Sequence, residues 1–267
     1  MTIRIGLFDS GVGGFTVLKR LLSIRKSYDY IYLADTARLP YGSKKKSDIR
    51  KYAFEIVDWF NNKNIDALFI ACNTTNSLAL DVFQDYAKYP YFDLISEAAK
   101  LISTKRIGVL ATEATVSSGA YTRELKKIDK SIFIYEKSCP GLVHRIESYS
   151  LDSIETKNLV SSYLEPLIKQ NLSEIILGCS HYPLLIELLN KLVPPHIEFI
   201  DPAVGLAKKV ENFDCFNSPR DINNEFLDNL YFFTTGDIDD FSNKVKVWFD
   251  INKEIKLTNL RIKTGAF

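Results

Sequence analysis

Residues 68–75 read LFIACNTT and residues 175–182 read IILGCSHY, so two apolar runs each end in a cysteine followed by hydrogen-bonding side chains. The sequence ahead of them repeats too, because RIGLF at residues 4–8 recurs as RIGVL at residues 106–110. One half of the chain therefore looks like a copy of the other, with a thiol at a strand end in each. If the halves face each other, Cys72 and Cys179 flank one cleft. That arrangement suits removal of a proton from one face of a carbon and delivery of a proton to the other.

Short β-rich runs alternate with longer segments of helical period, which predicts an α/β chain with mainly parallel sheets. Helices are expected at residues 46–64 and 237–250, where apolar side chains recur on one face. Strands are expected at residues 3–8, 30–34, 67–72, 106–111, 132–136, 174–179, 197–201 and 231–235. The repeat puts a boundary near residue 97, and the tail is expected to return to the first half. The predicted domains are residues 1–97 plus 208–267, and residues 98–207.

Composition excludes several function classes. The 267 residues suffice for one large or two medium domains, and 46% apolar content is ordinary for a globular protein. A net charge of +1 with interspersed signs predicts neither nucleic-acid nor membrane binding, and Lys44–Lys46 reads as a solvated turn. Without an apolar signal region or spanning segment, the protein is expected to be cytoplasmic. Free thiols, and no disulfide framework or metal site, are expected because no C-x-x-C spacing occurs among Cys72, Cys139, Cys179 and Cys215.

The segment DSGVGGFT at residues 9–16 follows the first expected strand. Its glycines let the backbone approach a ligand, and the next helix offers amides to an anion. It is not a dinucleotide fingerprint, because Thr16 occupies the last glycine position, and it lacks the lysine of a phosphate loop. A plain tight turn would also explain the glycines. Asp9 and Ser10, at the carboxyl end of a strand, favour a ligand site.

Two other polar segments follow expected strands. The loop DTARLPYGS at residues 35–43 holds a stiff proline and a permissive glycine, and turn chemistry explains it equally well. Asn73, Thr74 and Thr75 follow Cys72 directly. They are suited to capping a helix, to binding a carboxylate and an ammonium group, or to both.

A lone cysteine at a strand end is more often packing than a nucleophile, but two at equivalent places in a duplicated chain favour chemistry. His181 lies two residues from Cys179, and histidine is suited to proton transfer near neutral pH. On spacing alone, Glu147 is an ordinary acid on a helix surface. The residues expected to have no chemical role are Cys139 and Cys215, taken as structural, and His144 and His196, taken as surface residues.

Taken together, the motifs resemble those of glutamate racemases, in the cofactor-independent Asp/Glu racemase family. The matching motifs, in chain order, are DSGVGG at 9–14, DTARLPYG at 35–42, ACNTT at 71–75, GVLATEATV at 108–116 and GCSHYPLL at 178–185. The chain departs from the family pattern in three places. Ser180 stands where the family commonly has threonine, Thr75-Asn76 replaces a common Ala-Ser pair, and His144 replaces a frequent proline ahead of Glu147.

The resemblance implies two similar parallel-sheet α/β domains related by pseudo-two-fold symmetry, with the active site in the interdomain cleft, and a homodimer. It implies interconversion of L- and D-glutamate without a cofactor, supplying D-glutamate for peptidoglycan. Cys72 would deprotonate D-glutamate and Cys179 L-glutamate, the opposite thiol returning a proton. Asp9 and His181 resemble the polar assistants of the respective thiols, with Glu147 as a third. The positions that match substrate contacts are Asp9, Ser10, Pro40, Tyr41, Gly42, Ser43, Asn73, Thr74, Thr75, Thr115, Ser180 and His181.

The chemistry explains why such groups are needed. The α-proton is far less acidic than a thiol of pKa about 8.5, and each unit of mismatch costs about 1.4 kcal/mol. Hydrogen bonds to the substrate carboxylate in a closed, dry cleft must therefore stabilise a carbanion-like transition state. No residue marks a pyridoxal lysine, and a thiol pair would make that cofactor unnecessary.

Three alternatives remain open. An aspartate or related amino-acid racemase would share both thiols but need a shorter side-chain pocket. A cysteine hydrolase using Cys179 and His181 would form an acyl-enzyme and leave Cys72 dispensable. A non-catalytic module would keep the cleft to bind a ligand or a partner.

Overall fold

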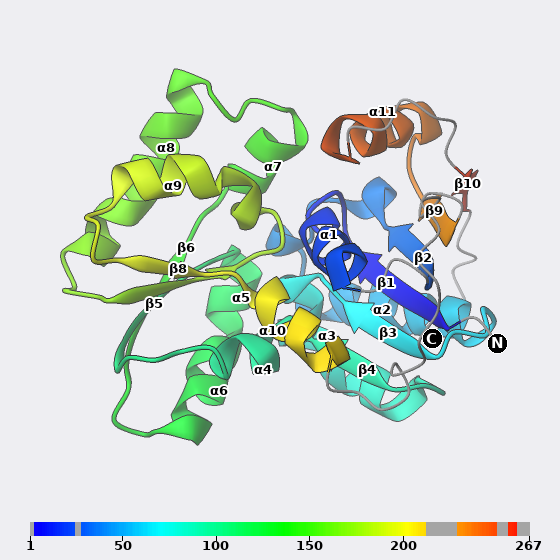
Figure 1. The fold of residues 1–267 in the computed structure, drawn as a ribbon, viewed down its shortest axis with the longest axis horizontal. Coiled ribbons are helices and arrows are strands. Elements are labelled where there is room, and N and C mark those ends of the chain that lie inside the picture. The colour runs from blue at the N-terminus through cyan, green and yellow to red at the C-terminus, as the bar shows by residue number, and fades with distance from the viewer. Residues whose placement is uncertain (1–2, 25–27, 212–228, 250–255, 261–267) are drawn as a thin grey trace.

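The computed structural model describes residues 3–24, 28–211, 229–249 and 256–260, which contain two parallel β-sheets (Figure 1). The first sheet has the strand order β10-β9-β2-β1-β3-β4 and the second the order β6-β5-β7-β8. The strands of the first sheet are β1 (Arg4–Asp9), β2 (Asp29–Ala34), β3 (Ala67–Ile70), β4 (Tyr91–Asp93), β9 (Leu230–Thr234) and β10 (Lys256–Asn259). Those of the second sheet are β5 (Arg106–Ala111), β6 (Phe133–Ser138), β7 (Glu174–Gly178) and β8 (Glu198–Ile200).

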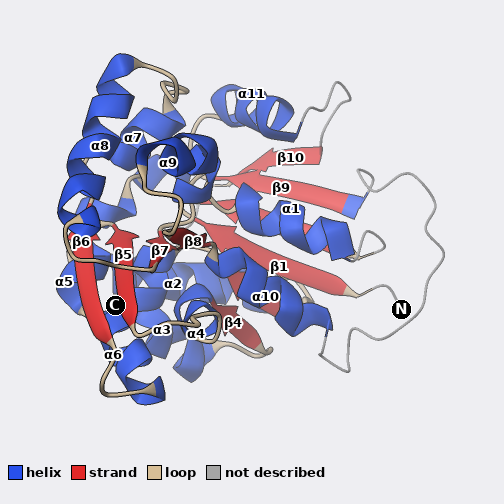
Figure 2. Cartoon of the chain, turned by 60° about the vertical axis from the view of Figure 1, so that its left-hand side comes forward, coloured by secondary structure: helices blue, strands red, loops and turns tan. Residues whose placement is uncertain are grey.

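Helices lie on both sides of the strands (Figure 2). Those that precede the second sheet in the chain are α1 (Phe15–Ile24), α2 (Lys46–Asn61), α3 (Asn73–Tyr86) and α4 (Leu94–Ala99), with the short 3₁₀ turns η1 (Thr36–Arg38) and η2 (Tyr41–Ser43). The following ones are α5 (Glu113–Ser118), α6 (Ala120–Ile128), α7 (Leu142–Glu147), α8 (Ile154–Ile168), η3 (Tyr182–Leu185), α9 (Ile186–Leu192), α10 (Pro202–Glu211) and α11 (Ile238–Phe249).

The two sheets repeat one arrangement, which confirms the predicted fold class. In the first, β1 pairs with β2 on one side and β3 on the other, and in the second β5 pairs in the same way with β6 and β7. The repeated sequences at residues 4–8 and 106–110 therefore occupy equivalent central strands. Every one of these pairings is parallel, so the carboxyl ends of β3 and β7, which precede Cys72 and Cys179, are equivalent positions.

The core explains why the strands read as continuous apolar runs. β3 and β7 are buried at every residue, because helices cover both faces of each sheet. On one face of the first sheet, Phe15 of α1 and Phe241 of α11 share a cluster with strand side chains. On the other face, α2 packs through buried apolar residues such as Ile49 and Phe60. Two further clusters cover the faces of the second sheet.

The described part of the tail lies on the first sheet. β9 pairs with β2, and β10 pairs with β9. α10 also packs there, since Leu206 belongs to the first-sheet cluster. α4 lies between the two sheets, because Leu94 joins a cluster of the first and Ile95 a cluster of the second. The domain limits near residues 97 and 208 stay a prediction.

The observed elements differ from the expected ones mainly at their ends. The strands that precede the two cysteines end at Ile70 and Gly178, because the chain turns there into α3 and η3. The edge strands β4 and β10 were not expected: β4 has three residues, and β10 reads KLTN without an apolar run. α2 ends at Asn61 instead of residue 64, and Asn64 has a φ of 50°, which a continuing helix does not adopt. No helix among the described residues is long and apolar enough to cross a membrane.

Candidate active site

Both predicted thiols are buried at the seam, which is the region where the two sheets and the loops that follow their strands meet. Cys72 lies at the start of α3 and is 3% exposed, and Cys179 follows β7 and is 5% exposed. Among the described cysteines, Cys139 is also free and buried, as expected for a structural residue, whereas Cys215 lies outside the described residues. His144 and His196 are exposed, as predicted.

The surroundings of Cys72 favour its protonated form. Its thiol donates a weak hydrogen bond to the Ser10 hydroxyl, with 3.9 Å between Sγ and Oγ. Burial and the negative charge of Asp9 raise the pKa of Cys72 to about 12, although hydrogen bonds with Thr75 and Ser10 oppose this rise. A buried thiol with this pKa is a proton donor at neutral pH.

Asp9 influences Cys72 through its charge. Its carboxylate accepts hydrogen bonds from Gly11 N at 3.0 Å and from Ser180 Oγ at 2.9 Å. Burial raises the pKa of Asp9, and the nearby positive charge of His181 and these hydrogen bonds offset part of that rise. Asp9 therefore connects the Cys72 side of the seam with the Cys179 side.

Cys179 lies beside an imidazole that is held at both ring nitrogens. Nδ1 of His181 is 3.8 Å from Cys179 Sγ, and Nε2 is 2.7 Å from Glu147 Oε1. Burial acts to lower the pKa of His181, but the hydrogen bonds and charges of Cys179 and Glu147 raise it well above its ordinary value. His181 can therefore donate a proton to each partner, which suits an assistant to proton transfer at Cys179.

Glu147 is not the surface acid that its spacing indicated. It is 7% exposed, because α7 turns its last residue toward the loop after β1, where Val12 N donates to Oε1 at 3.0 Å. Burial acts to raise the pKa of Glu147, yet the hydrogen bond and charge of His181, the Val12 amide and the charge of Lys244 lower it to about 2. The side chain is thus an ionised partner for His181.

The glycine-rich loop after β1 closes against these side chains. A Cβ on Gly11 would lie 2.2 Å from Glu147 Oε1, and a Cβ on Gly13 would lie 2.4 Å from both His181 Nδ1 and Ser180 Oγ. The sequence predicted glycines that let the backbone approach a ligand. In the structure they admit side chains from the second half of the chain, and the anion at the loop amides is the carboxylate of Glu147.

Asn73 has a buried amide whose two ends are in different situations. Its Oδ1 accepts a 2.7 Å hydrogen bond from Tyr121 Oη, which fixes the orientation of the amide. The buried Nδ2 atom has no hydrogen-bond partner among the described residues. A neighbouring network across the seam joins Thr74 Oγ1 to Thr112 Oγ1 at 3.0 Å, and Thr112 Oγ1 to Thr115 Oγ1 at 2.9 Å.

The predicted residues of the loop after β2 differ from one another in burial. Tyr41 is buried, and its hydroxyl donates to Asp35, which also forms an ion pair with Arg38. A Cβ on Gly42 would lie 2.7 Å from Thr112 Cβ, so this glycine allows close contact between the halves. Pro40 and Ser43 are exposed.

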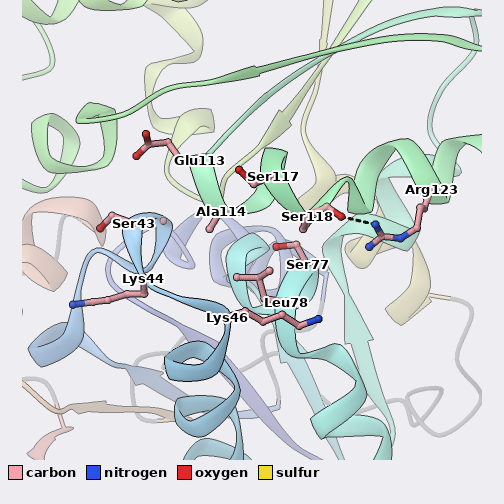
Figure 3. A pocket seen from close by; sticks show the side chains of 11 residues that line it. Ser43, Lys44, Lys46, Ser77, Leu78, Glu113, Ala114, Ser117, Ser118 and Arg123 are labelled. Atoms are coloured by element: carbon pink, nitrogen blue, oxygen red, sulfur yellow. Dashed lines mark hydrogen bonds between the residues drawn. The ribbon is translucent and has the colours of Figure 1, made fainter.

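A groove of about 800 Å³ opens beside this loop (Figure 3). Its lining residues include Gly42, Ser43, Lys44, Lys46, Glu113, Ser117 and Arg123. Neither thiol lines it. Among the described residues, no cluster of three or more His, Cys, Asp or Glu side chains could hold a metal ion.

A family model described as Asp/Glu/Hydantoin racemase matches residues 16–210. The chain belongs to this racemase family. It is 45% identical over 262 residues to a glutamate racemase of Prochlorococcus marinus (strain NATL1A), covering 98% of each chain. Its fold matches the glutamate racemase of Francisella tularensis subsp. tularensis SCHU S4, solved with D-glutamate, with a TM-score of 0.88 and 30% identity over 99% of each chain. The Thermus thermophilus enzyme, solved with beta-chloro-D-alanine, gives a TM-score of 0.85 at 30% identity over 98% of each chain.

In this member of the racemase family, residues that the sequence did not single out also contact the predicted site. Tyr121 orients Asn73, Thr112 holds Thr74, and Lys244 on α11 forms an ion pair with Glu147. The motif GVLATEATV includes Thr112, so its hydroxyl was within reach of the sequence argument. Tyr121 and Lys244 lie outside all five motifs, and no local sequence pattern indicates a role for them at the site.

Proposed function

We propose that this racemase-family chain interconverts L- and D-glutamate by proton transfer between the substrate and two thiols. One observation carries the proposal: Cys72 and Cys179 are buried at equivalent strand ends of two equivalent sheets, and each has its own polar neighbours. Similarity to glutamate racemases over nearly the whole chain supports glutamate as the substrate.

In the direction from L- to D-glutamate, the Cys179 thiolate removes the α-proton, and the Cys72 thiol gives its proton to the opposite face of the carbon. Cys179 is then a thiol and Cys72 a thiolate, ready for the reverse reaction. Return to the starting state requires one proton to leave Cys179 and one to reach Cys72. His181, in contact with Cys179 Sγ, is placed to assist on that side.

The α-carboxylate of the substrate needs hydrogen-bond donors whose bonds become stronger as negative charge develops in the transition state. Asn73 Nδ2 is one, because it is buried, oriented by Tyr121 and without a partner among the described residues. The backbone amides at the start of α3 are others, since a helix N-terminus favours an anion. Ser10 and Thr74 complete the proposed substrate contacts on this side.

The thiols are almost fully buried, so glutamate must enter through a more open arrangement of the two halves. The groove beside Gly42 and Ser43 is the proposed approach, because Lys44, Lys46 and Arg123 give it a positive lining that attracts carboxylates. Supply of D-glutamate for peptidoglycan is the proposed role. The homodimer and the cytoplasmic location stay predictions.

Polarimetry of L-glutamate with the purified protein tests the function. The expected result is loss of optical activity without added cofactor, unchanged after dialysis against a chelator and a carbonyl-trapping reagent. L-aspartate, run in parallel, should keep its optical activity. Racemisation of aspartate but not glutamate would favour the alternative racemase, and no turnover of either would favour a binding module.

A further inference from the structure

Lys244 lies against the carboxylate that holds the active-site imidazole. Its Nζ is 3.1 Å from Glu147 Oε2 and 2.8 Å from Asp240 Oδ2, and its side chain is only 11% exposed. The two oxygens of Glu147 thus have separate partners. Oε1 accepts hydrogen bonds from His181 and Val12, whereas Oε2 forms the ion pair with Lys244.

The lysine comes from the opposite half of the molecule. α11 packs on the first sheet through Phe241 and Val245, both fully buried, and the Phe241 ring lies 5.8 Å from that of Phe15. Glu147 ends α7 of the second half, and α7 and α11 face each other at the top of Figure 1. The ion pair therefore crosses the seam between the halves and ends beside the active site.

A stabilising ion pair on the protein surface would not by itself explain why Lys244 lies against Glu147. Asp240 is 58% exposed and lies one turn before Lys244, so the lysine has an acidic partner without approaching the seam. Exposed pairs of that kind contribute little to stability, and partial burial of an ammonium group has a desolvation cost. The lysine instead extends to a nearly buried carboxylate whose other oxygen binds the imidazole.

We propose that Lys244 is a positioning residue for proton transfer at Cys179. By holding Oε2 of Glu147, it keeps Oε1 on Nε2 of His181 and so keeps Nδ1 directed at Cys179 Sγ. This inference rests on the proposed racemase function. It predicts that loss of Lys244 slows the step at Cys179 more than the step at Cys72.

The test is Lys244→Met, with Lys246→Met as the matched control, because Lys246 is exposed on the same helix. Steady-state rates are measured with both enantiomers, each with hydrogen or deuterium at the α-carbon, together with thermal unfolding. Lys244→Met should lower kcat about tenfold with KM changed less than about twofold, and Lys246→Met should match wild type. Lys244→Arg should retain most of the activity and serves as the second variant if Lys244→Met does not fold.

The isotope effects separate positioning from a structural role. Because the two enantiomers are equal in free energy, kcat/KM must fall equally in both directions. If the Cys179 step has become slower, the effect on kcat/KM should rise for α-deuterated L-glutamate and fall for α-deuterated D-glutamate. Normal turnover by Lys244→Met, or lower turnover with both isotope effects unchanged, overturns the inference. Failure of the wild-type protein to racemise glutamate overturns the proposed function instead.

Discussion

The Ser180 hydroxyl donates a 2.9 Å hydrogen bond to Oδ1 of Asp9, linking the residue after one thiol to the first strand of the other half. Ser10, next to Asp9, contacts Cys72. A short series of contacts thus joins the surroundings of both thiols, and the charge of Asp9 acts on Cys72 and His181 alike.

This hydrogen bond predicts different outcomes for two substitutions of Ser180. Ser180→Ala leaves Asp9 with one fewer donor in a buried site, so kcat should fall about tenfold or more. Ser180→Thr retains the hydroxyl and should stay within about threefold of wild type. Kinetics of both variants, with thermal unfolding as the check on folding, decide this. Equal activity of the two variants would show that the hydroxyl has no role.

Gly13→Ala should nearly abolish turnover. Its Cβ would lie 2.4 Å from His181 Nδ1 and Ser180 Oγ, so either the loop or the imidazole must move, and His181 loses its alignment with Cys179. We expect kcat to fall by about 100-fold or more. Gly119→Ala is the control, because its φ of +63° imposes backbone strain while its nearest neighbour, Arg123 Nη1, is 3.4 Å away. Comparable loss of activity in both variants would attribute the effect to general destabilisation.

The fold could be predicted because apolar runs and helical periods report it directly. β1, β3, β5 and β7 are interior strands of their sheets, where both faces are covered, so their sequences are nearly continuous apolar stretches. β10, at a sheet edge, reads KLTN, and such a strand has no distinctive pattern. Its pairing with β9 depends on where the tail of the chain packs in the folded protein, which the local sequence does not indicate.

The site was predictable only where its residues follow strands. Cys72 and Cys179 were found from a repeated pattern, and His181 from its closeness to Cys179. Glu147 was expected on a helix surface because its burial depends on where α7 meets the loop after β1, which local spacing does not encode. Lys244 depends on the docking of α11 against a distant part of the chain, so no local pattern indicates it.

Glu147→Gln should destabilise the protein in a pH-dependent way. The folded protein lowers the pKa of Glu147 from 4.5 to about 2, so this contribution is present above pH 4.5 and is lost as pH falls toward 2. It raises the pKa of His181 above 6.5, so that contribution is present below pH 6.5 and is lost as pH rises through the higher folded value. Urea unfolding should therefore show the largest difference between wild type and variant at about pH 4.5–6.5. A difference independent of pH would contradict the ion pair.

Each of the two thiols in the proposed mechanism should be essential. Cys72→Ala and Cys179→Ala should each lower racemisation by about 1000-fold or more, because a proton removed from one face has no donor on the other. Cys139→Ala is the matched control: this thiol is also buried, and it contacts the Lys137 carbonyl in the second half. Cys139→Ala and Cys215→Ala should remain near wild type. Substantial racemisation by either of the first two variants would reject the two-thiol mechanism.

The most direct measurement is the position of solvent deuterium early in the reaction in D₂O. With L-glutamate as substrate, mass spectrometry of the separated enantiomers should find deuterium at the α-carbon of the D-glutamate formed. The recovered L-glutamate should keep ordinary hydrogen at its α-carbon. The same should hold with the enantiomers exchanged, since in the proposed mechanism Cys72 and Cys179 act on opposite faces and do not share a proton. Equal early labelling of substrate and product would contradict the account and point to a single base.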